Sequence, residues 1–219
     1  MDNEPHDMTP PSAVKPTAGR DYSDRLVRLS TARWKKLLDV QRPYRWNLRR
    51  LELGRCLDVG CGTGRNLANL GAGAVGVDHN PYSVAEAVAL GCSAYTPEQF
   101  FADPALSAEG SYDSLLAAHL VEHLTPDEAS GVVSGYLPLV APGGRCVFIT
   151  PQERGYASDL THVTFTDFSA LEQLADRLGL VTERRYSFPF PRPAGRFFTY
   201  NEFVLVARKP ASGSRNSAP

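Results

Sequence analysis

Long apolar runs are missing from this chain of 219 residues. No stretch approaches the roughly 18 consecutive apolar residues that span a bilayer, and the N-terminus has no apolar core of a secretion signal. An excess of one charge is also missing, because 23 basic side chains nearly balance 24 acidic ones. These absences predict a soluble, cytoplasmic protein without membrane insertion, and nothing global marks a nucleic-acid or membrane-surface binder.

Cysteine is scarce, and its spacing forms no metal or redox motif. The four cysteines, Cys56, Cys61, Cys92 and Cys146, form no CxxC pair. Three of them fall within or beside apolar runs, where a buried free thiol is ordinary. This usage fits a reducing cytosol.

The length and an apolar share of 42% fit one domain with a substantial core. Residues 1–20 and 211–219 are mostly polar, so both ends are predicted to be disordered tails. Apolar spacing over residues 21–53 predicts two helices that lead into the domain and are interrupted at Pro43. The domain as a whole is expected to cover residues 21–210.

Short β-type runs then alternate with helical segments. Strands are predicted over residues 55–59, 74–78, 93–95, 112–118, 145–150, 180–186 and 202–208, and helices over 65–70, 81–90, 126–138 and 168–178. Asn80 before Pro81 starts one helix, and Thr125 with Glu128 forms a capping box for another. The alternation predicts a doubly wound α/β fold with a mostly parallel seven-stranded sheet. The last two strands have no helix between them and predict an antiparallel edge hairpin.

A glycine-rich turn follows the first predicted strand, in the segment Leu57-Asp58-Val59-Gly60-Cys61-Gly62-Thr63-Gly64. Ligands of open α/β sheets bind at the carboxyl ends of the strands, and glycine lets backbone amides approach a ligand without an intervening Cβ. Asp78 ends the second strand, where a carboxylate is placed to accept both hydroxyls of an adenosine ribose. A plain strand-to-helix turn and a surface aspartate are the structural alternatives.

This turn does not match two common nucleotide-binding motifs. A nicotinamide fingerprint starting at Gly60 needs glycine where Arg65 stands, and a P-loop needs Gly-Lys-Ser/Thr where Gly64-Arg65-Asn66 stands. With LDVGCGTG the chain instead resembles the class I S-adenosylmethionine-dependent methyltransferases, whose fold has seven strands with an edge hairpin. The resemblance covers residues 53–209 and implies a Rossmann-like enzyme that uses S-adenosyl-L-methionine as its cofactor.

The resemblance also implies roles for individual residues. Asp58 is expected near the methionine amino group, Gly60 and Gly62 beside the methionine and ribose, and Asp78 on the ribose hydroxyls. Further cofactor contacts are expected at neighbouring positions, namely Cys61, Gly64, His79, Ala118 and His119. The family often has an acidic residue after the third strand to contact adenine, where this chain reads TPEQF over residues 96–100. Gln99 and Phe100 are the candidates there, and a capped helix start is the alternative.

A cluster of titratable residues follows the fourth strand, in the segment His119-Leu120-Val121-Glu122-His123. A subset of similar methyltransferases uses ExxEH with a later histidine to hold a divalent metal, but this chain has histidine in the first place. His162 completes a set of four nitrogen and oxygen ligands that a transition metal accepts. Local capping or pairing of Glu122 with an arginine is the alternative, and no metal is assigned.

His162 is the predicted general base. It lies between the fifth strand and the last helix, where this family builds part of its acceptor pocket. Methyl transfer is an in-line displacement at the sulfonium methyl, so a hydroxyl acceptor must lose its proton. Histidine titrates near working pH, and Asp159 is expected to orient it, with His123 and Glu122 as further catalytic candidates. A loop histidine that only bonds backbone is the alternative.

The acceptor is predicted to be a small molecule, a sugar or a lipid-linked molecule, methylated at oxygen. Tyr44, Trp46 and Asn47 are candidates for its walls, as is the aromatic loop over residues 187–200, although aromatics there also serve packing. Residues 21–50 carry nine basic against three acidic side chains, which fits a solvated helix face, with attraction of a phosphorylated, acidic or lipid-phosphate substrate as the functional alternative. A nucleic-acid acceptor is expected less than a small molecule, and RNA methylation is kept as the alternative function. A cofactor-binding protein without turnover is the third interpretation. The oligomeric state is not predicted.

Overall fold

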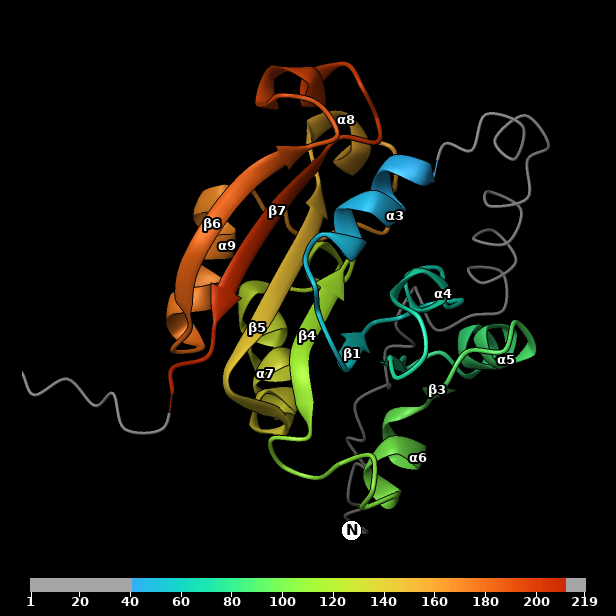
Figure 1. Cartoon of the computed structure of the whole chain (residues 1–219). Coiled ribbons are helices and arrows are strands. Elements are labelled where there is room, and N and C mark those ends of the chain that lie inside the picture. Colours follow the sequence, from blue (N-terminus) through green and yellow to red (C-terminus); the bar gives the residue numbers. More distant parts are fainter. Residues whose placement is uncertain (1–40, 212–219) are drawn as a thin grey trace, which may run out of the picture.

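A seven-stranded sheet forms the centre of the computed structural model, which describes residues 41–211 (Figure 1). The strands are β1 (Cys56–Val59), β2 (Val75–Val77), β3 (Ala94–Tyr95), β4 (Tyr112–Ala118), β5 (Val140–Pro151), β6 (Val181–Phe188) and β7 (Glu202–Arg208). They lie in the order β3-β2-β1-β4-β5-β7-β6. The first five run parallel, and β7 runs antiparallel to both neighbours. The predicted doubly wound α/β fold with an antiparallel edge hairpin is confirmed.

Helices fill the connections between the strands. The α-helices are α3 (Arg42–Arg49), α4 (Leu67–Leu70), α5 (Pro81–Ala89), α6 (Pro97–Ala102), α7 (Pro126–Tyr136), α8 (Glu153–Tyr156) and α9 (Phe168–Arg177), and the short 3-10 helices are η1 (Val121–His123), η2 (Leu137–Leu139) and η3 (Arg192–Arg196). Asn80 accepts from the amides of Tyr82 and Ser83 at the start of α5, and Thr125 forms a capping box with Glu128 at α7, both as predicted.

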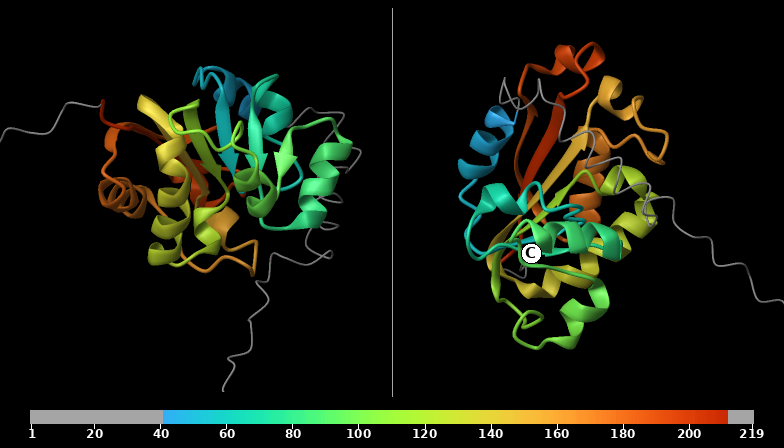
Figure 2. Two further views of the ribbon diagram at one scale, coloured as in Figure 1. Left: turned by 90° about the horizontal axis from the view of Figure 1, so that it is seen from below. Right: turned by 90° about the vertical axis from the view of Figure 1, so that its right-hand side faces the viewer.

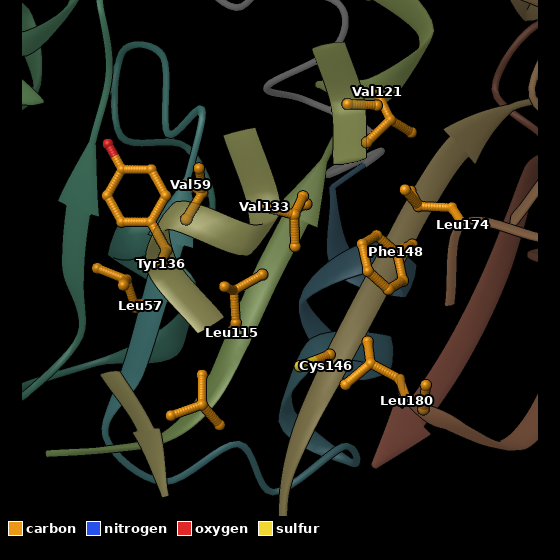
Figure 3. Close-up of a cluster of buried hydrophobic side chains, with 14 of the residues drawn as sticks. Leu57, Val59, Leu115, Val121, Val133, Tyr136, Cys146, Phe148, Leu174 and Leu180 are labelled. Atoms are coloured by element: carbon orange, nitrogen blue, oxygen red, sulfur yellow. The ribbon is translucent and has the colours of Figure 1, made fainter. Parts of the chain in front are cut away.

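The helices cover both faces of the sheet (Figure 2). On one face, α7 and α9 pack against side chains of β1, β4 and β5 such as Leu57, Leu115 and Phe148 (Figure 3). On the other face, α3 and the segment after it pack on Leu116 and Val147, while α4 and α5 form a neighbouring cluster. Because side chains alternate along a strand, each inner strand contributes to both layers of core.

Several predicted boundaries differ from the observed ones. Strand β5 begins at Val140, five residues before the predicted start, because the segment expected to be a turn continues along β4 and β7. Helix α3 begins at Arg42, one residue before the predicted break, and Pro43 lies in its first turn, where a missing amide hydrogen costs nothing. The predictions for residues 1–40 and 212–219 lie outside the described residues. Among the described helices, none has the length and apolar composition needed to cross a lipid bilayer.

Candidate functional site

The glycine turn lies where the strand order reverses, between β1 and β4, which is where open α/β sheets bind ligands. Gly60 and Gly62 have φ angles of 77° and 53°, in the left-handed region that favours glycine. A Cβ on Gly60 would also come 2.9 Å from Cδ1 of Leu120, the residue after His119. Glycine therefore allows the turn after β1 to meet the segment after β4 closely.

Asp78 fastens this turn to the next strand. Its Oδ2 accepts from the Gly62 amide at 2.8 Å, and its Oδ1 accepts from the Asn80 amide at 2.8 Å. Its side chain is 10% exposed, and exposed His79 has Nδ1 3.6 Å from the same Oδ1. Each carboxylate oxygen accepts more than one hydrogen bond, so Asp78 keeps acceptor capacity for a ligand diol in a fixed orientation.

Asp58 is a buried carboxylate without hydrogen-bond partners among the described residues. It lies on β1 opposite Leu116 of β4, with 0% exposure, and within residues 41–211 neither Oδ1 nor Oδ2 has a hydrogen-bond partner. Burial and the charge of Asp78 raise its pKa to about 7, against the opposing charge of Arg65. Since buried polar groups are normally hydrogen-bonded, this carboxylate fits a site completed by a cationic donor.

Other predicted cofactor contacts have structural tasks. Cys61 is buried and its amide donates to the carbonyl of Val77, which extends the pairing of β1 and β2. Gly64 faces α5, because a Cβ there would come 3.0 Å from the Cβ of Ala87. Ala118 lies at the end of β4 and lines a hollow beside α3.

The adenine contact predicted for Gln99 and Phe100 is not supported by their positions. Oε1 of Gln99 accepts from the Thr96 amide at 3.0 Å in the capping box of α6, which the helix-start alternative anticipated. Phe100 is fully buried against Tyr112 and Tyr136, so its ring has no surface for a base. The capping box of α6 therefore engages Gln99, and the core engages Phe100.

His119 lies between two carboxylates. Its Nδ1 is 3.2 Å from Oε1 of Glu122, and its Nε2 is 3.0 Å from Oε1 of Glu202. Burial lowers its pKa, but the two carboxylates outweigh burial and raise the pKa to about 9. Its φ of 57° is unusual for a residue other than glycine. The imidazolium joins the end of β4 to the start of β7.

Glu202 was not predicted as a site residue. It begins β7, precedes the apolar run FVLVA, and is 7% exposed. An acidic residue at the edge of such a run was the available signal. Its partner His119 is 83 residues away, and only the β5–β7 pairing brings the two together.

Glu122 and His123 of η1 form a second polar cluster with His162. One potential ligand atom from each lies within 4.8 Å of the others. Glu122 is 0% exposed, and its Oε2 has no hydrogen-bond partner among the described residues. The rings of the two histidines are 4.8 Å apart, and burial lowers the pKa of His123. The three predicted catalytic residues are thus brought together.

A backbone carbonyl, rather than Asp159, orients the ring of His162. Nδ1 of His162 is 2.7 Å from the carbonyl oxygen of Tyr156, whose ring also stacks on the imidazole. Asp159 instead accepts from the amide and hydroxyl of Thr161 at 3.0 and 2.8 Å. Because a carbonyl only accepts, Nδ1 carries the hydrogen and Nε2 of His162 is the basic nitrogen.

The hollow beside α3 opens at the same end of the sheet. Its lining includes Tyr44, Asn47, Arg65, Asn69, His119 and Glu202. Tyr44 and Asn47 were predicted as acceptor walls, whereas Trp46 lies outside and stacks on Phe188 at 6.3 Å. A wider hollow, lined by Asp113 and Arg145, lies where β4 and β5 begin, away from every predicted site residue.

Comparisons with known proteins identify the family. A family model described as a methyltransferase domain matches residues 19–185. No match was found among curated proteins. A SAM-dependent methyltransferase from Archaeoglobus fulgidus has a similar structure, with a TM-score of 0.60, 18% identity, and coverage of 80% of this chain and 97% of that one.

Two further solved structures have the same fold. Magnesium protoporphyrin IX methyltransferase from Synechocystis PCC 6803 with bound SAH has a TM-score of 0.60 at 18% identity, covering 90% of this chain and 98% of that one. The N-methyltransferase NodS from Bradyrhizobium japonicum WM9 has a TM-score of 0.58 at 16% identity, covering 78% and 96%. The chain belongs to the methyltransferase-domain family and has the fold of class I S-adenosylmethionine-dependent methyltransferases.

Proposed function

We propose that this chain transfers the methyl group of S-adenosylmethionine to an oxygen of a small-molecule, sugar or lipid-linked acceptor. The observation that carries this proposal is the cluster of Glu122, His123 and His162 at the end of the sheet that holds the glycine turn. A hydroxyl needs a proton acceptor in methyl transfer, and this cluster supplies basic nitrogens beside a buried carboxylate.

The cofactor supplies an activated methyl on a sulfonium, and the protein holds and orients it. In this proposal Asp78 accepts the ribose hydroxyls, and Asp58 faces the methionine ammonium directly or through water. Both fit the structure, because Asp78 is held by two amides and Asp58 lacks hydrogen-bond partners among the described residues. Nε2 of His162 takes the acceptor proton while Nδ1 donates to Tyr156.

Labelling identifies the acceptor and separates the candidate functions. The protein is incubated with methyl-labelled S-adenosylmethionine and an extract of the source cell, and labelled products are identified by mass. The expected product is an O-methylated small or lipid-linked molecule. Label found in RNA would show that the acceptor is RNA and not a small molecule. Binding of S-adenosylhomocysteine without any labelled product would indicate a protein without turnover.

Removing the imidazole of His162 is expected to slow methyl transfer and spare cofactor binding. His162→Ala should lower turnover by roughly 100-fold or more, the usual contribution of a general base. Turnover is measured on the identified acceptor, and S-adenosylhomocysteine binding is measured by calorimetry. Leu160→Ala is the matched control, because it changes the same loop at a side chain that is 98% exposed and has no titrating group. Unchanged turnover in His162→Ala would remove the assignment.

A metal ion is a second way in which this cluster handles an acceptor oxygen. It is favoured by the grouping of one ligand atom from each side chain within 4.8 Å and by Oε2 of Glu122, which has no hydrogen-bond partner in the described part of the chain. With His162 as base, purified protein should contain well below one equivalent of divalent metal, and chelator should leave turnover unchanged. About one bound equivalent that Glu122→Gln loses, together with chelator sensitivity, would assign the cluster to a metal instead.

A cytoplasmic location is part of this proposal. It is supported by the cysteines, since all four are free, and Cys56, Cys61 and Cys146 are buried. The partner expected at the site is the acceptor molecule itself, with nucleic acid as the alternative that labelling tests.

A further inference from the structure

Two segments far apart in the sequence meet at the end of the sheet that holds the candidate site. The hydroxyl of Tyr44 in α3 donates to the carbonyl of Tyr200 at 2.6 Å, and its ring meets the ring of Phe188 edge-on, with centroids 5.7 Å apart. The loop over residues 188–201, which contains η3, projects beyond the strands in two views (orange-red, at the top of Figure 1 and of the right panel of Figure 2). Residues 42–50 and 188–201 together form what we call the α3–η3 surface.

Aromatic rings are exposed across this surface. The exposed fraction of Phe197 is 84%, and about half of each of three further rings is exposed, those of Trp46, Phe190 and Tyr200. Phe190, Phe198 and Tyr200 form a row of contacting rings, with neighbouring centroids 5.2 and 5.7 Å apart. Single exposed apolar side chains are common on folded proteins, whereas a contiguous group of them marks a binding surface.

The α3–η3 surface is also strongly basic. Residues 42–50 contain four arginines and residues 188–201 contain two, and neither segment contains aspartate or glutamate. Arg42 and Arg50 lie four residues before and after Trp46, so they share its face of α3. The guanidinium of Arg50 lies 4.5 Å from the centroid of the Trp46 ring. Positive charge therefore flanks an exposed aromatic ring.

The carboxylate of Glu153 in α8, next to this loop, is engaged by the loop itself. Nη1 of Arg192 donates to Oε2 of Glu153 at 2.8 Å. This hydrogen bond lowers the pKa of Glu153 against partial burial, and the charge of Arg196 lowers it further. Arg196 is itself exposed, so the loop still presents positive charge to its surroundings.

Helix α8 connects the α3–η3 surface to the cluster of the candidate base. Its first residue, Glu153, is bound by Arg192 of η3. The ring of its last residue, Tyr156, stacks on His162 with centroids 5.1 Å apart. Four residues of helix span only about 6 Å, so a molecule held at the surface lies close to the proposed site of methyl transfer.

Exposed aromatic rings among arginines, without acidic residues in either segment, match the chemistry of an anionic lipid surface. Aromatic side chains favour the headgroup level of a membrane, and arginine attracts lipid phosphates. We propose that the α3–η3 surface docks this protein on a membrane that contains anionic lipids. The projecting loop suits a flat lipid surface, whereas single-stranded nucleic acids are held in positively charged grooves. Peripheral docking of this kind needs no membrane-spanning helix.

Docking brings lipid-linked acceptors to the catalytic end of the sheet. This consequence rests on the proposed function, because it narrows the proposed acceptor to its lipid-linked class. The docking itself requires neither cofactor nor turnover, so it can be measured separately.

Sedimentation with vesicles tests the docking. The full chain is mixed, without cofactor, with vesicles of equal parts phosphatidylglycerol and phosphatidylcholine, or of phosphatidylcholine alone. Binding to the anionic vesicles should be at least about tenfold stronger and should weaken in high salt. Phe197→Ala should lower the partition coefficient roughly 10-fold through lost apolar burial, and Arg196→Gln roughly fivefold through one lost charge. Leu90→Ala is the matched control and should change nothing, because it shortens an exposed apolar side chain at the end of α5, beside the opposite edge strand β3.

Several results would overturn the docking proposal. They are a failure of the unaltered protein to bind anionic vesicles, equal binding to both kinds of vesicle, and unchanged binding in both loop variants. Tighter binding to a single-stranded RNA oligonucleotide, lost in the same variants, would assign the surface to nucleic acid. A dimer in light scattering that Phe197→Ala dissociates would assign it to a second copy of the chain.

Thermal unfolding of each variant checks that the fold is retained. Failure of the docking and failure of the proposed function are distinguishable. Absent vesicle binding removes the surface and leaves methyl transfer standing, whereas absent binding of S-adenosylhomocysteine in calorimetry removes the proposed function and leaves the surface standing.

Discussion

Replacing Asp78 with alanine is expected to weaken the binding of S-adenosylhomocysteine strongly. The carboxylate is proposed to accept two ribose hydroxyls, and hydrogen bonds to a charged group contribute roughly 1.5–3 kcal/mol each. The substitution also leaves the amides of Gly62 and Asn80 without their acceptor, which loosens the glycine turn. Together these losses predict a rise in Kd of roughly 100-fold or more, measured by calorimetry.

A matched control separates a lost ligand contact from a weakened fold. Asp167 caps α9 by accepting from the Ala170 amide at 3.0 Å, and its replacement by alanine should cost about 1 kcal/mol of stability. Asp167→Ala should therefore lower the melting temperature and leave Kd unchanged. If Asp78→Ala instead binds within about threefold of the unaltered protein, the ribose is held elsewhere.

Binding of S-adenosylhomocysteine is expected to weaken in acid because of Asp58. With the site empty, burial and Asp78 raise the pKa of this carboxyl to about 7, so below that pH it is protonated. An ammonium favours the ionised form, and binding must then release a proton. The affinity should fall about tenfold for each pH unit below 7 and level off above it. Asp58→Asn should bind weakly at pH 8 and lose this dependence.

The same carboxyl makes a prediction for the stability of the empty protein. A carboxyl whose pKa is raised by folding stabilises the native state fully at low pH, and this contribution is lost as pH rises from about 4 to about 7. The loss is roughly 4 kcal/mol at most, from about 1.4 kcal/mol per pKa unit. Asp58→Asn should remove this slope and raise the melting temperature at pH 8. Parallel pH profiles for the two proteins would contradict the account.

Elements with complete local signals were predicted closely. Strands β4 and β7 have the predicted bounds, because each contains an uninterrupted apolar run, Leu115 to Ala118 in β4 and Phe203 to Ala207 in β7. Helices α5 and α7 begin where predicted, because Asn80 and Thr125 supply the capping oxygens. Such signals depend on neighbouring residues only, and the sequence contains all of them.

Contacts between distant segments could not be predicted in this way. Nothing near His119 indicates Glu202, and nothing near His162 indicates that a carbonyl rather than Asp159 holds its ring. The burial of Phe100, which was a candidate for the adenine contact, could not be predicted for the same reason, since its partners Tyr112 and Tyr136 lie on other elements. From the sequence, Arg65 indicated only that the turn is neither a nicotinamide fingerprint nor a P-loop. Its position in the hollow emerges once α3 is placed against α4.

A crystal structure of the complex with S-adenosylhomocysteine tests the central claim most directly. The account predicts both ribose hydroxyls within hydrogen-bond distance of Asp78, about 2.5–3.0 Å, with the amino-acid end turned toward Asp58. A ligand bound away from the glycine turn, or a ribose whose hydroxyls avoid Asp78, would contradict it.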